Sequence, residues 1–218
     1  MVRIAPSILS ADFAALGDAI SRVEPVADLL HVDVMDGHFV PNLTIGPPVV
    51  AAINRHTDMV LDCHLMMTNP GEYLGAFQRA GADWVSVHVE VDRTGELLDE
   101  MRGLGLEAGL AINPETPFEA IEPWLDGLHH VLVMTVHPGF GGQEFMHEVM
   151  PKLRRIAAHS NGAIVEVDGG IDARTVPIVA EAGATCFVAG HAVFDQPDPA
   201  AAVTALRRAA EATVGSGR

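Results

Sequence analysis

The sequence predicts a (β/α)8 barrel of the TIM type that forms a single domain over residues 1–218. Apolar runs of strand length alternate eight times with amphipathic stretches, and no composition break, long linker or low-complexity segment separates them. The length agrees, because barrels of this kind commonly form one domain of about 200–250 residues. A doubly wound sheet is the alternative. Its usual glycine-rich loop is missing after the first strand, where Pro-Ser-Ile-Leu-Ser-Ala-Asp stands.

The expected elements follow one another along the whole chain. Strands are expected at 2–8, 29–35, 58–65, 83–89, 106–112, 130–136, 163–168 and 185–190. Helices are expected at 15–25, 47–55, 70–80, 94–103, 117–124, 146–159, 173–182 and 198–213. Asn69-Pro70 and Asp172 precede two of the helical runs as start signals. Ala80-Gly81-Ala82 and Ala182-Gly183-Ala184 fit helix C-caps that lead into the next strand.

Charge and composition exclude several kinds of partner. The formal net charge is −16, whereas nucleic acid and anionic membranes attract clustered basic residues. No apolar run approaches the roughly 20 residues that span a bilayer, and the first residues have no signal-peptide layout. Cys63 and Cys186 lie inside apolar runs, which argues against a disulfide scaffold and for a reducing compartment. We therefore expect a cytoplasmic protein that binds neither nucleic acid nor membrane.

Lys152 is the only lysine of the chain. A Schiff-base mechanism would have to use it, and it falls in a helical stretch with no apolar pocket suggested around it. Any phosphate group should therefore be bound mainly by backbone amides and helix N-termini, with little help from cationic side chains.

Polar residues stand at the carboxyl ends of the expected strands, where barrel enzymes carry their chemistry. In the run from His31 to Met35, strand alternation points His31, Asp33 and Met35 to one face. A buried histidine and carboxylate are costly unless something binds them, and the simplest such thing is a metal ion. A half-exposed edge strand is the alternative. Taken in order, the strand ends carry Ser7, His31, Asp33, His64, His88, Asn113, Met134, Asp168 and Gly190.

Taken singly, most of these residues have an ordinary structural explanation. His88 is better explained as a hydrogen-bonded core histidine than as a metal ligand, and Ser7 as the partner of a backbone group. Methionines 35, 66 and 134 would be packing residues in most proteins. The argument for a site therefore rests on the convergence of several strand ends.

Four side chains can reach one central point of such a barrel: His31, Asp33, His64 and Asp168. Two imidazoles and two carboxylates suit a divalent transition metal such as zinc, iron(II) or manganese better than calcium or magnesium. With no electrophilic lysine, this set suggests proton abstraction next to a carbonyl, and carboxylates on opposite sides of the carbon would invert it. Aldol cleavage and metal-water hydrolysis remain alternatives on the same atoms.

Glycines indicate a phosphate site beside this cluster. The stretch 137–143, His-Pro-Gly-Phe-Gly-Gly-Gln, follows the sixth strand and resembles a mobile loop. Gly169-Gly170 follows the seventh strand and Ala189-Gly190 ends the eighth, where barrel enzymes often bind phosphate through backbone amides. Each glycine alone is also an ordinary turn residue, so the indication comes from their presence on adjacent strands. The acidic surface is no objection, because the binding field is local.

Several long motifs, in the right order, resemble the ribulose-phosphate 3-epimerase family. They run from Pro-Ser-Ile-Leu-Ser-Ala-Asp-Phe at 6–13 to Val-Ala-Gly-His-Ala-Val-Phe at 188–194. Between them stand His-Val-Asp-Val-Met-Asp-Gly-His-Phe-Val-Pro-Asn, Cys-His-Leu-Met-Met, Val-Met-Thr-Val-His-Pro-Gly-Phe-Gly-Gly-Gln and Val-Asp-Gly-Gly. The resemblance implies a barrel that interconverts D-ribulose 5-phosphate and D-xylulose 5-phosphate in the pentose phosphate pathway. It also implies one Zn2+, Fe2+ or Mn2+ ion and a homo-oligomer, either a dimer or a hexamer.

The resemblance further implies a role for each matching residue. The metal ligands would be His31, Asp33, His64 and Asp168. Asp33 and Asp168 would also be the catalytic acid–base pair, with Asp33 the base for one epimer and Asp168 the base for the other. The substrate would contact Ser7 and His64 at the sugar oxygens, Met35, Met66 and Met134 beneath the enediolate, and the backbone amides of Gly139, Gly141, Gly142, Gly170, Gly190 and His191 at the phosphate.

Two positions depart from the family pattern. His191 stands where the family usually has serine, and His137 where it often has asparagine or another polar residue. His191 keeps a backbone amide, loses the hydroxyl and adds a group that titrates near neutral pH. Epimerases of longer ketose phosphates, such as allulose 6-phosphate, share most of these motifs, so the length of the sugar stays open. A metal-dependent aldolase or hydrolase, and a barrel that only binds sugar phosphates, are the competing classes.

Overall fold

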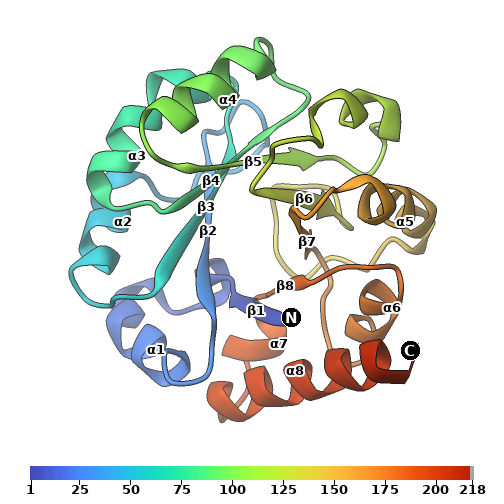
Figure 1. The fold of residues 1–218 in the computed structure, drawn as a ribbon. Helices are drawn as coiled ribbons and strands as arrows, with labels where there is room; N and C mark the ends of the chain where they lie inside the picture. The colour runs from blue at the N-terminus through green and yellow to red at the C-terminus, as the bar shows by residue number, and fades with distance from the viewer. Residues whose placement is uncertain (217–218) are drawn as a thin grey trace.

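Eight parallel strands form a barrel at the centre of the molecule, and the helices surround it (Figure 1). The computed structural model describes residues 1–216. The strands pair in the order β1-β8-β7-β6-β5-β4-β3-β2, so each lies beside its neighbour in the sequence. They are β1 Arg3–Pro6, β2 Leu29–Met35, β3 Val60–Met66, β4 Trp84–His88, β5 Glu107–Ile112, β6 His130–Met134, β7 Ile164–Asp168 and β8 Cys186–Ala189. The predicted fold class is confirmed.

The helices are α1 Leu16–Val23, α2 Pro47–Asn54, α3 Leu74–Ala80, α4 Thr94–Gly103, α5 Met150–His159, α6 Val176–Glu181, α7 His191–Phe194 and α8 Pro199–Ser216. The α-helix expected at 117–124 is wrong, because two 3-10 turns, Phe118–Ala120 and Glu122–Trp124, stand there instead. Pro123 has no N–H to donate and its ring would clash with the preceding turn, so an α-helix cannot continue through it. The four-residue α7 was not expected, since so short a helix leaves no periodic pattern.

β1 and β2 meet where the barrel closes. A parallel bridge joins Ser7 to His31. Near the start of both strands, the Asp28 N–H donates to the Ile4 carbonyl at 3.1 Å, and the Asp28 carboxylate accepts from the Ile4 N–H at 2.7 Å. Arg207 of α8 donates to the same carboxylate at 2.8 Å. The sheet is therefore a closed barrel, which excludes the doubly wound alternative.

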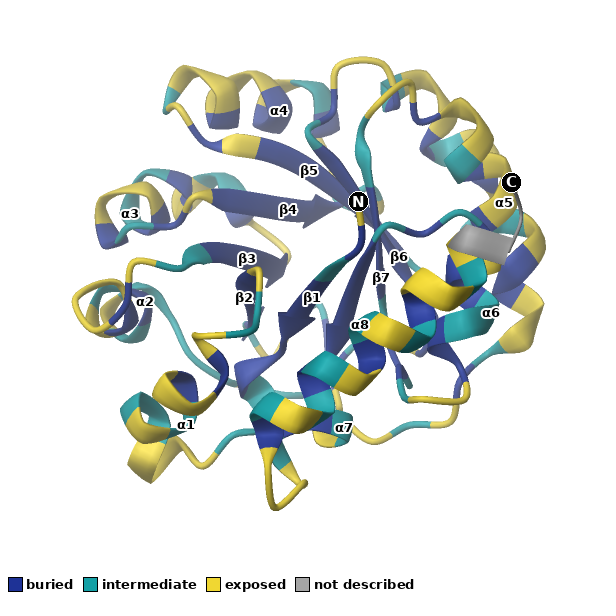
Figure 2. Ribbon diagram, turned by 60° about the horizontal axis from the view of Figure 1, so that its bottom comes forward, coloured by how far each residue is buried: buried dark blue, intermediate teal, exposed yellow. Residues whose placement is uncertain are grey.

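The strands are buried on both faces, as parallel strands covered by helices must be. In Figure 2 the barrel strands are almost entirely dark blue, and the yellow exposed residues lie on the outer faces of the helices. All seven residues of β2 are buried. The half-exposed edge strand that was the alternative for this segment is therefore excluded, and its polar residues face the barrel interior.

The barrel interior is filled by side chains of unequal size. Trp84 of β4 stacks on His130 of β6, with the ring centroids 5.3 Å apart. Gly109 of β5 lies between these strands, and a Cβ atom there would come within 2.2 Å of His130 Nε2. The glycine is thus required by the histidine ring beside it, because protein interiors leave no spare volume.

No helix within residues 1–216 is long and apolar enough to cross a membrane. Cys63 and Cys186 are buried free thiols, as expected for a chain without a disulfide scaffold. Burial raises the pKa of both thiols well above the usual value, so neither is a reactive thiolate.

Asp28→Ala should lower the free energy of unfolding by about 2 kcal/mol, since it removes a charged acceptor from two donors at the seam of the barrel. Urea unfolding at neutral pH measures this loss. Glu211→Ala, an exposed change on α8, is the control and should stay within about 0.5 kcal/mol of the starting protein. Equal stability of the two variants would contradict the role assigned to Asp28.

Candidate active site and metal centre

A pocket opens at the carboxyl ends of the strands. It contains twelve of the site residues that the sequence predicts, which lie at strand ends or in the turns that follow them. These residues are Ser7, Asp33, Met35, Met66, Met134, Gly139, Gly141, Gly142, Asp168, Gly170, Gly190 and His191. His31 and His64 are fully buried and lie beneath it. The sequence therefore located the pocket, and its floor is made of inward-facing strand residues.

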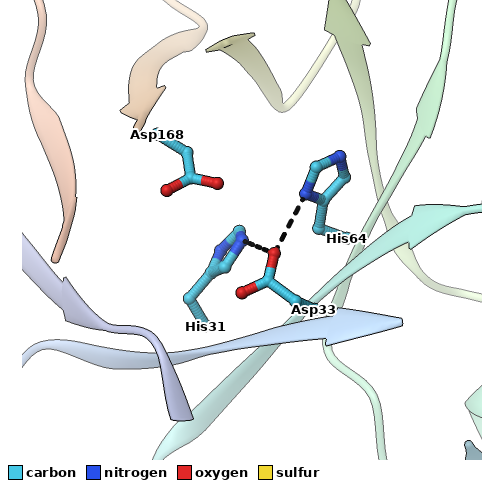
Figure 3. Close-up of side chains that lie close together, drawn as sticks. All are labelled: His31, Asp33, His64 and Asp168. Atoms are coloured by element: carbon cyan, nitrogen blue, oxygen red, sulfur yellow. Dashed lines mark hydrogen bonds and ion pairs between the residues drawn. The ribbon is translucent and has the colours of Figure 1, made fainter. Parts of the chain in front are cut away.

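Four potential metal ligands converge at the floor of this pocket. One ligand atom each from His31, Asp33, His64 and Asp168 lies within 4.8 Å of all the others. Asp33 Oδ1 is 3.4 Å from both His31 Nε2 and His64 Nδ1, and Asp168 faces them from the far side (Figure 3). The parallel register produces this cluster, because β2 and β3 pair Asp33 with His64 and both side chains point inward.

The donors of this cluster fit a divalent transition metal. His31 Nε2 is buried and has no hydrogen-bond partner among the described residues, although polar atoms buried in a barrel are normally paired. Asp33 Oδ1 lies 3.4 Å from this nitrogen, at ion-pair distance. An unpartnered imidazole nitrogen that faces two carboxylates and a second imidazole is the donor set that zinc, iron(II) and manganese accept.

Asp33 carries a negative charge that its surroundings stabilise. Burial alone would raise its pKa, but the positive charge of His31 and the imidazole of His64 beside it lower that pKa well below the usual value. Ser7 Oγ donates to Asp33 Oδ2 at 2.6 Å. Asp33 is therefore an ionised carboxylate at neutral pH.

The pKa of Asp168 is shifted in the opposite direction. Burial, and then the charge of Asp33, raise the pKa of Asp168 to about 7. Of the two carboxyl groups in this cluster, Asp33 is thus ionised at neutral pH and Asp168 is about half protonated. This is the asymmetry expected of an acid–base pair.

The two candidate histidine ligands also differ from each other. Burial would lower the pKa of His31, but the charges of Asp33 and Asp62 raise it well above the usual value. Burial lowers the pKa of His64 to about 4, so this imidazole is neutral. Metal ligation requires the neutral form of both rings, so a cation bound here would displace a proton from His31.

The methionines form an apolar wall beside the carboxylates. Met35 and Met66 are buried together with Val40, and Phe39 packs against them. Met134 is buried at the end of β6, whose register pairs it with Asp168. Met35 and Met66 each stand two residues after a polar site residue on the same strand, so strand alternation points them to the same side as that residue. Met134 lies beside Asp168 on the neighbouring strand.

The loop after β6 is held by side-chain hydrogen bonds. Gln143 Nε2 donates to the carbonyls of His137 and Phe140 at 2.6 and 2.8 Å. Asn42 Nδ2 donates to the Gly139 carbonyl at 2.7 Å. Gly139 and Gly142 have φ angles of 126° and 73°, which other residues rarely adopt. At these two positions the turn therefore presents backbone to the pocket with no side chain attached.

His191 and His137 lie in different surroundings. The His191 ring lines the pocket, bonds to Ser10 Oγ at 3.1 Å and lies against Gly141, where a Cβ atom would be 2.6 Å from His191 Cε1. His137 pairs with Glu115 at 2.8 Å, is exposed and is not part of the pocket lining. Of the two departures from the family pattern, only His191 borders the pocket.

The side chain of Lys152 makes its hydrogen bonds outside the pocket. Its Nζ atom donates to the carbonyls of Asn113, Pro114 and Thr116, at 2.5, 2.9 and 2.9 Å. Burial lowers its pKa to about 8. The amine is nevertheless occupied as a loop anchor and is not part of the pocket lining.

Three polar residues around the cluster were not among the site residues that the sequence predicted. Asp62 Oδ2 lies 2.6 Å from His31 Nδ1, Glu166 Oε1 lies 3.8 Å from the same atom, and His88 Nε2 lies 2.8 Å from His64 Nε2. The expectation that His88 is a hydrogen-bonded core histidine is confirmed. Strand alternation was the available signal for Asp62, because it shares the inward face of β3 with His64.

Fold and site together define a (β/α)8-barrel enzyme with a carboxylate pair at the catalytic mouth of the barrel. A family model described as Ribulose-phosphate 3 epimerase family matches residues 3–194. The chain belongs to the ribulose-phosphate 3-epimerase family and is accordingly an epimerase, of the isomerase class.

Relatives support this membership over nearly the whole chain. The Bacillus subtilis (strain 168) protein named ribulose-phosphate 3-epimerase is 50% identical over 217 residues, covering 95% of this chain and 99% of its own. The Oryza sativa subsp. japonica protein named ribulose-phosphate 3-epimerase, cytoplasmic isoform, is 45% identical over 215 residues, covering 96% and 94%.

More distant solved structures share the fold. The 3-hexulose-6-phosphate synthase from Salmonella typhimurium has a TM-score of 0.74 at 16% identity, covering 97% of this chain and 100% of its own. The 3-keto-L-gulonate-6-phosphate decarboxylase from Vibrio cholerae has a TM-score of 0.75 at 18% identity, covering 97% and 98%. Identities this low support the common barrel alone.

The pKa of Asp168 predicts a pH effect on stability in chelator-treated protein. Between 3.8, its usual pKa, and about 7 the folded state holds this proton and the unfolded chain does not. The free energy of unfolding should therefore fall as pH rises through this window. Asp168→Asn removes this dependence. From about pH 5 to pH 8, the free energy of unfolding of the starting protein should therefore fall by on the order of 1–2 kcal/mol more than that of the variant. Urea unfolding at both values measures the difference, and parallel pH profiles would contradict the raised pKa.

Proposed function

We propose that this enzyme interconverts D-ribulose 5-phosphate and D-xylulose 5-phosphate by removing a proton from carbon 3 and returning it on the opposite face. The observation that carries the proposal is the pairing of an ionised Asp33 with Asp168, whose pKa is raised to about 7, across one cluster at the mouth of the barrel. Membership of the epimerase family supports the same reaction. One group is ready to accept a proton and the other to donate one.

Asp33 and Asp168 exchange roles with the direction of the reaction. In one direction Asp33 takes the carbon-bound proton and Asp168 delivers its own to the other face. Each carboxyl group then has the protonation state that the reverse reaction requires. The hydrogen bond from Ser7 holds Asp33 Oδ2 and so fixes the orientation of the carboxylate. Ser7 and His64 would also contact the sugar oxygens.

His31, Asp33, His64 and Asp168 would hold one divalent ion, Zn2+, Fe2+ or Mn2+. Such a cation would polarise the substrate carbonyl and offset the charge that develops on the enediolate oxygens. Methionines 35, 66 and 134 would exclude water from the same region, since they form its apolar wall. A dry site keeps the abstracted proton from exchanging freely with solvent.

The phosphate would lie across the mouth from the carboxylates. Backbone amides would bind it at Gly139, Gly141, Gly142, Gly170, Gly190 and His191, all of which line the pocket. Gly170 has a φ of 63°, and a Cβ atom there would come within 3.0 Å of Phe145, so a side chain would close this part of the pocket. With Lys152 occupied elsewhere, the phosphate would depend mainly on amide dipoles.

We further propose a single-domain chain over 1–218, a cytoplasmic location and a homo-oligomer, either a dimer or a hexamer. The name of the rice relative, a cytoplasmic isoform, supports the location. The assembly rests on the family resemblance. Sedimentation or light scattering would measure its size.

An epimerase acting on a longer sugar, such as allulose 6-phosphate, is the second candidate. His191 is the reason to test it, because this ring changes the pocket wall where the family usually has serine. A metal-dependent aldolase or hydrolase receives no such support, although the same donor set could serve either.

Solvent deuterium tests the reaction. Incubation of ribulose 5-phosphate in heavy water should place deuterium at carbon 3 of the recovered sugar, whereas a hydrolase or a binding protein would leave carbon 3 unlabelled. Asp33→Asn and Asp168→Asn should each lower turnover by about 10²-fold or more, the usual contribution of a general acid or base, with the fold intact. Turnover like that of the starting protein in either variant would refute the two-carboxylate mechanism.

A coupled assay with pentulose and hexulose phosphates tests the length of the sugar. We expect a higher kcat/KM for ribulose 5-phosphate than for allulose 6-phosphate. His191→Ser should change KM more than kcat, because the ring borders the pocket away from the carboxylates. A preference for the hexulose phosphate would replace the first candidate by the second.

A further inference from the structure

Each of the two candidate histidine ligands makes a hydrogen bond with the ring nitrogen that points away from the cluster. His31 presents Nε2 to Asp33, and its Nδ1 lies 2.6 Å from Asp62 Oδ2. Both of these side chains are completely buried. Because a carboxylate only accepts hydrogen bonds, the proton of this contact is on His31 Nδ1, so the neutral ring that binds a metal has its lone pair on Nε2.

His64 reaches a carboxylate through a second imidazole. Its Nε2 lies 2.8 Å from His88 Nε2, and His88 Nδ1 lies 3.0 Å from Glu90 Oε2. The two rings are stacked with centroids 4.9 Å apart, and the Asn113 N–H holds the other oxygen of Glu90 at 2.8 Å. A series of hydrogen bonds therefore connects His64 of the cluster, through His88, to the carboxylate of Glu90, which the backbone holds in place.

If the imidazoles of His64 and His88 are both neutral, only one arrangement of their protons satisfies the hydrogen bonds from His64 to Glu90. Glu90 accepts from His88 Nδ1–H, which leaves His88 Nε2 as an acceptor. His64 must then donate from Nε2–H, and its lone pair is on Nδ1, the atom that faces Asp33. The opposite arrangement would put a proton on the ligating nitrogen and block it.

We propose that Asp62 and Glu90 are positioning residues that set the tautomers of the two histidine ligands, so that His31 offers Nε2 and His64 offers Nδ1 to one cation. This inference rests on the proposed function, because it assumes that the cluster binds metal. Carboxylates that accept the outer N–H of a ligating histidine fix the ring and increase its basicity. Here one carboxylate acts directly on His31, and the other acts on His64 through His88.

The variants Asp62→Asn and Glu90→Gln keep size and shape but replace a pure acceptor by an amide that can also donate. Each should weaken Zn2+ or Mn2+ binding by about 10–100-fold, as loss of outer hydrogen-bond partners typically does. Competition with a chelator of known affinity measures this on folded protein. Co2+-loaded protein provides an independent signature, because its visible spectrum should change in both variants.

Asp83→Asn is the matched control. The Asp83 carboxylate accepts from the Leu61 N–H at 2.8 Å near the start of β3, at the end of the strand opposite the cluster. This variant should lose stability but bind metal within about twofold of the starting protein, since it changes no partner of either histidine. It separates a loss of positioning from a general loss of stability.

Nitrogen-15 NMR of the Zn2+-loaded starting protein gives a test that needs no variant of Asp62 or Glu90 to fold. The expected result is a protonated Nδ1 on His31 and a protonated Nε2 on His64. The opposite tautomer on either ring overturns the proposal, as does unchanged metal affinity in both variants. The failure of the starting protein to bind metal near one ion per chain would instead refute the metal site of the proposed function.

Discussion

The buried charge of Asp33 is the constraint on which the other features of the site depend. A carboxylate placed inside a barrel loses the stabilisation of water and survives only if the protein supplies donors. Ser7 donates a hydrogen bond to this carboxylate, and the imidazoles of His31 and His64 lie 3.4 Å from its other oxygen; the three residues come from different strands or strand ends. Once Asp33 holds the charge, Asp168 cannot ionise as easily beside it. Two chemically identical side chains thereby acquire pKa values shifted in opposite directions.

The four cluster residues could be predicted because strand alternation is a local rule. His31 and Asp33 share one face of β2, and a barrel brings the carboxyl ends of all strands together, so His64 and Asp168 follow. The fold class followed from the eightfold alternation in the same way. Long motifs then indicated the family, which the relatives support.

The residues behind the cluster could not be assigned roles by local rules. Asp62 shares a face with His64, yet its partner is on β2, and that depends on the register of two strands. The contact from His88 to Glu90 depends on how the chain turns after β4, which alternation does not describe. The expected helix at 117–124 failed for another reason, since apolar periodicity outweighed a proline that could have been read as a break.

The close fit of Gly109 against His130 has a consequence for how this barrel can change. No side chain larger than hydrogen fits at position 109 while an imidazole occupies position 130, and that ring also fills the space beside Trp84. The sizes of the side chains at positions 109 and 130 on these neighbouring strands are therefore coupled, because both draw on the same space. Sequences that drift apart from this one must exchange both together, or pass through an intermediate whose barrel is strained.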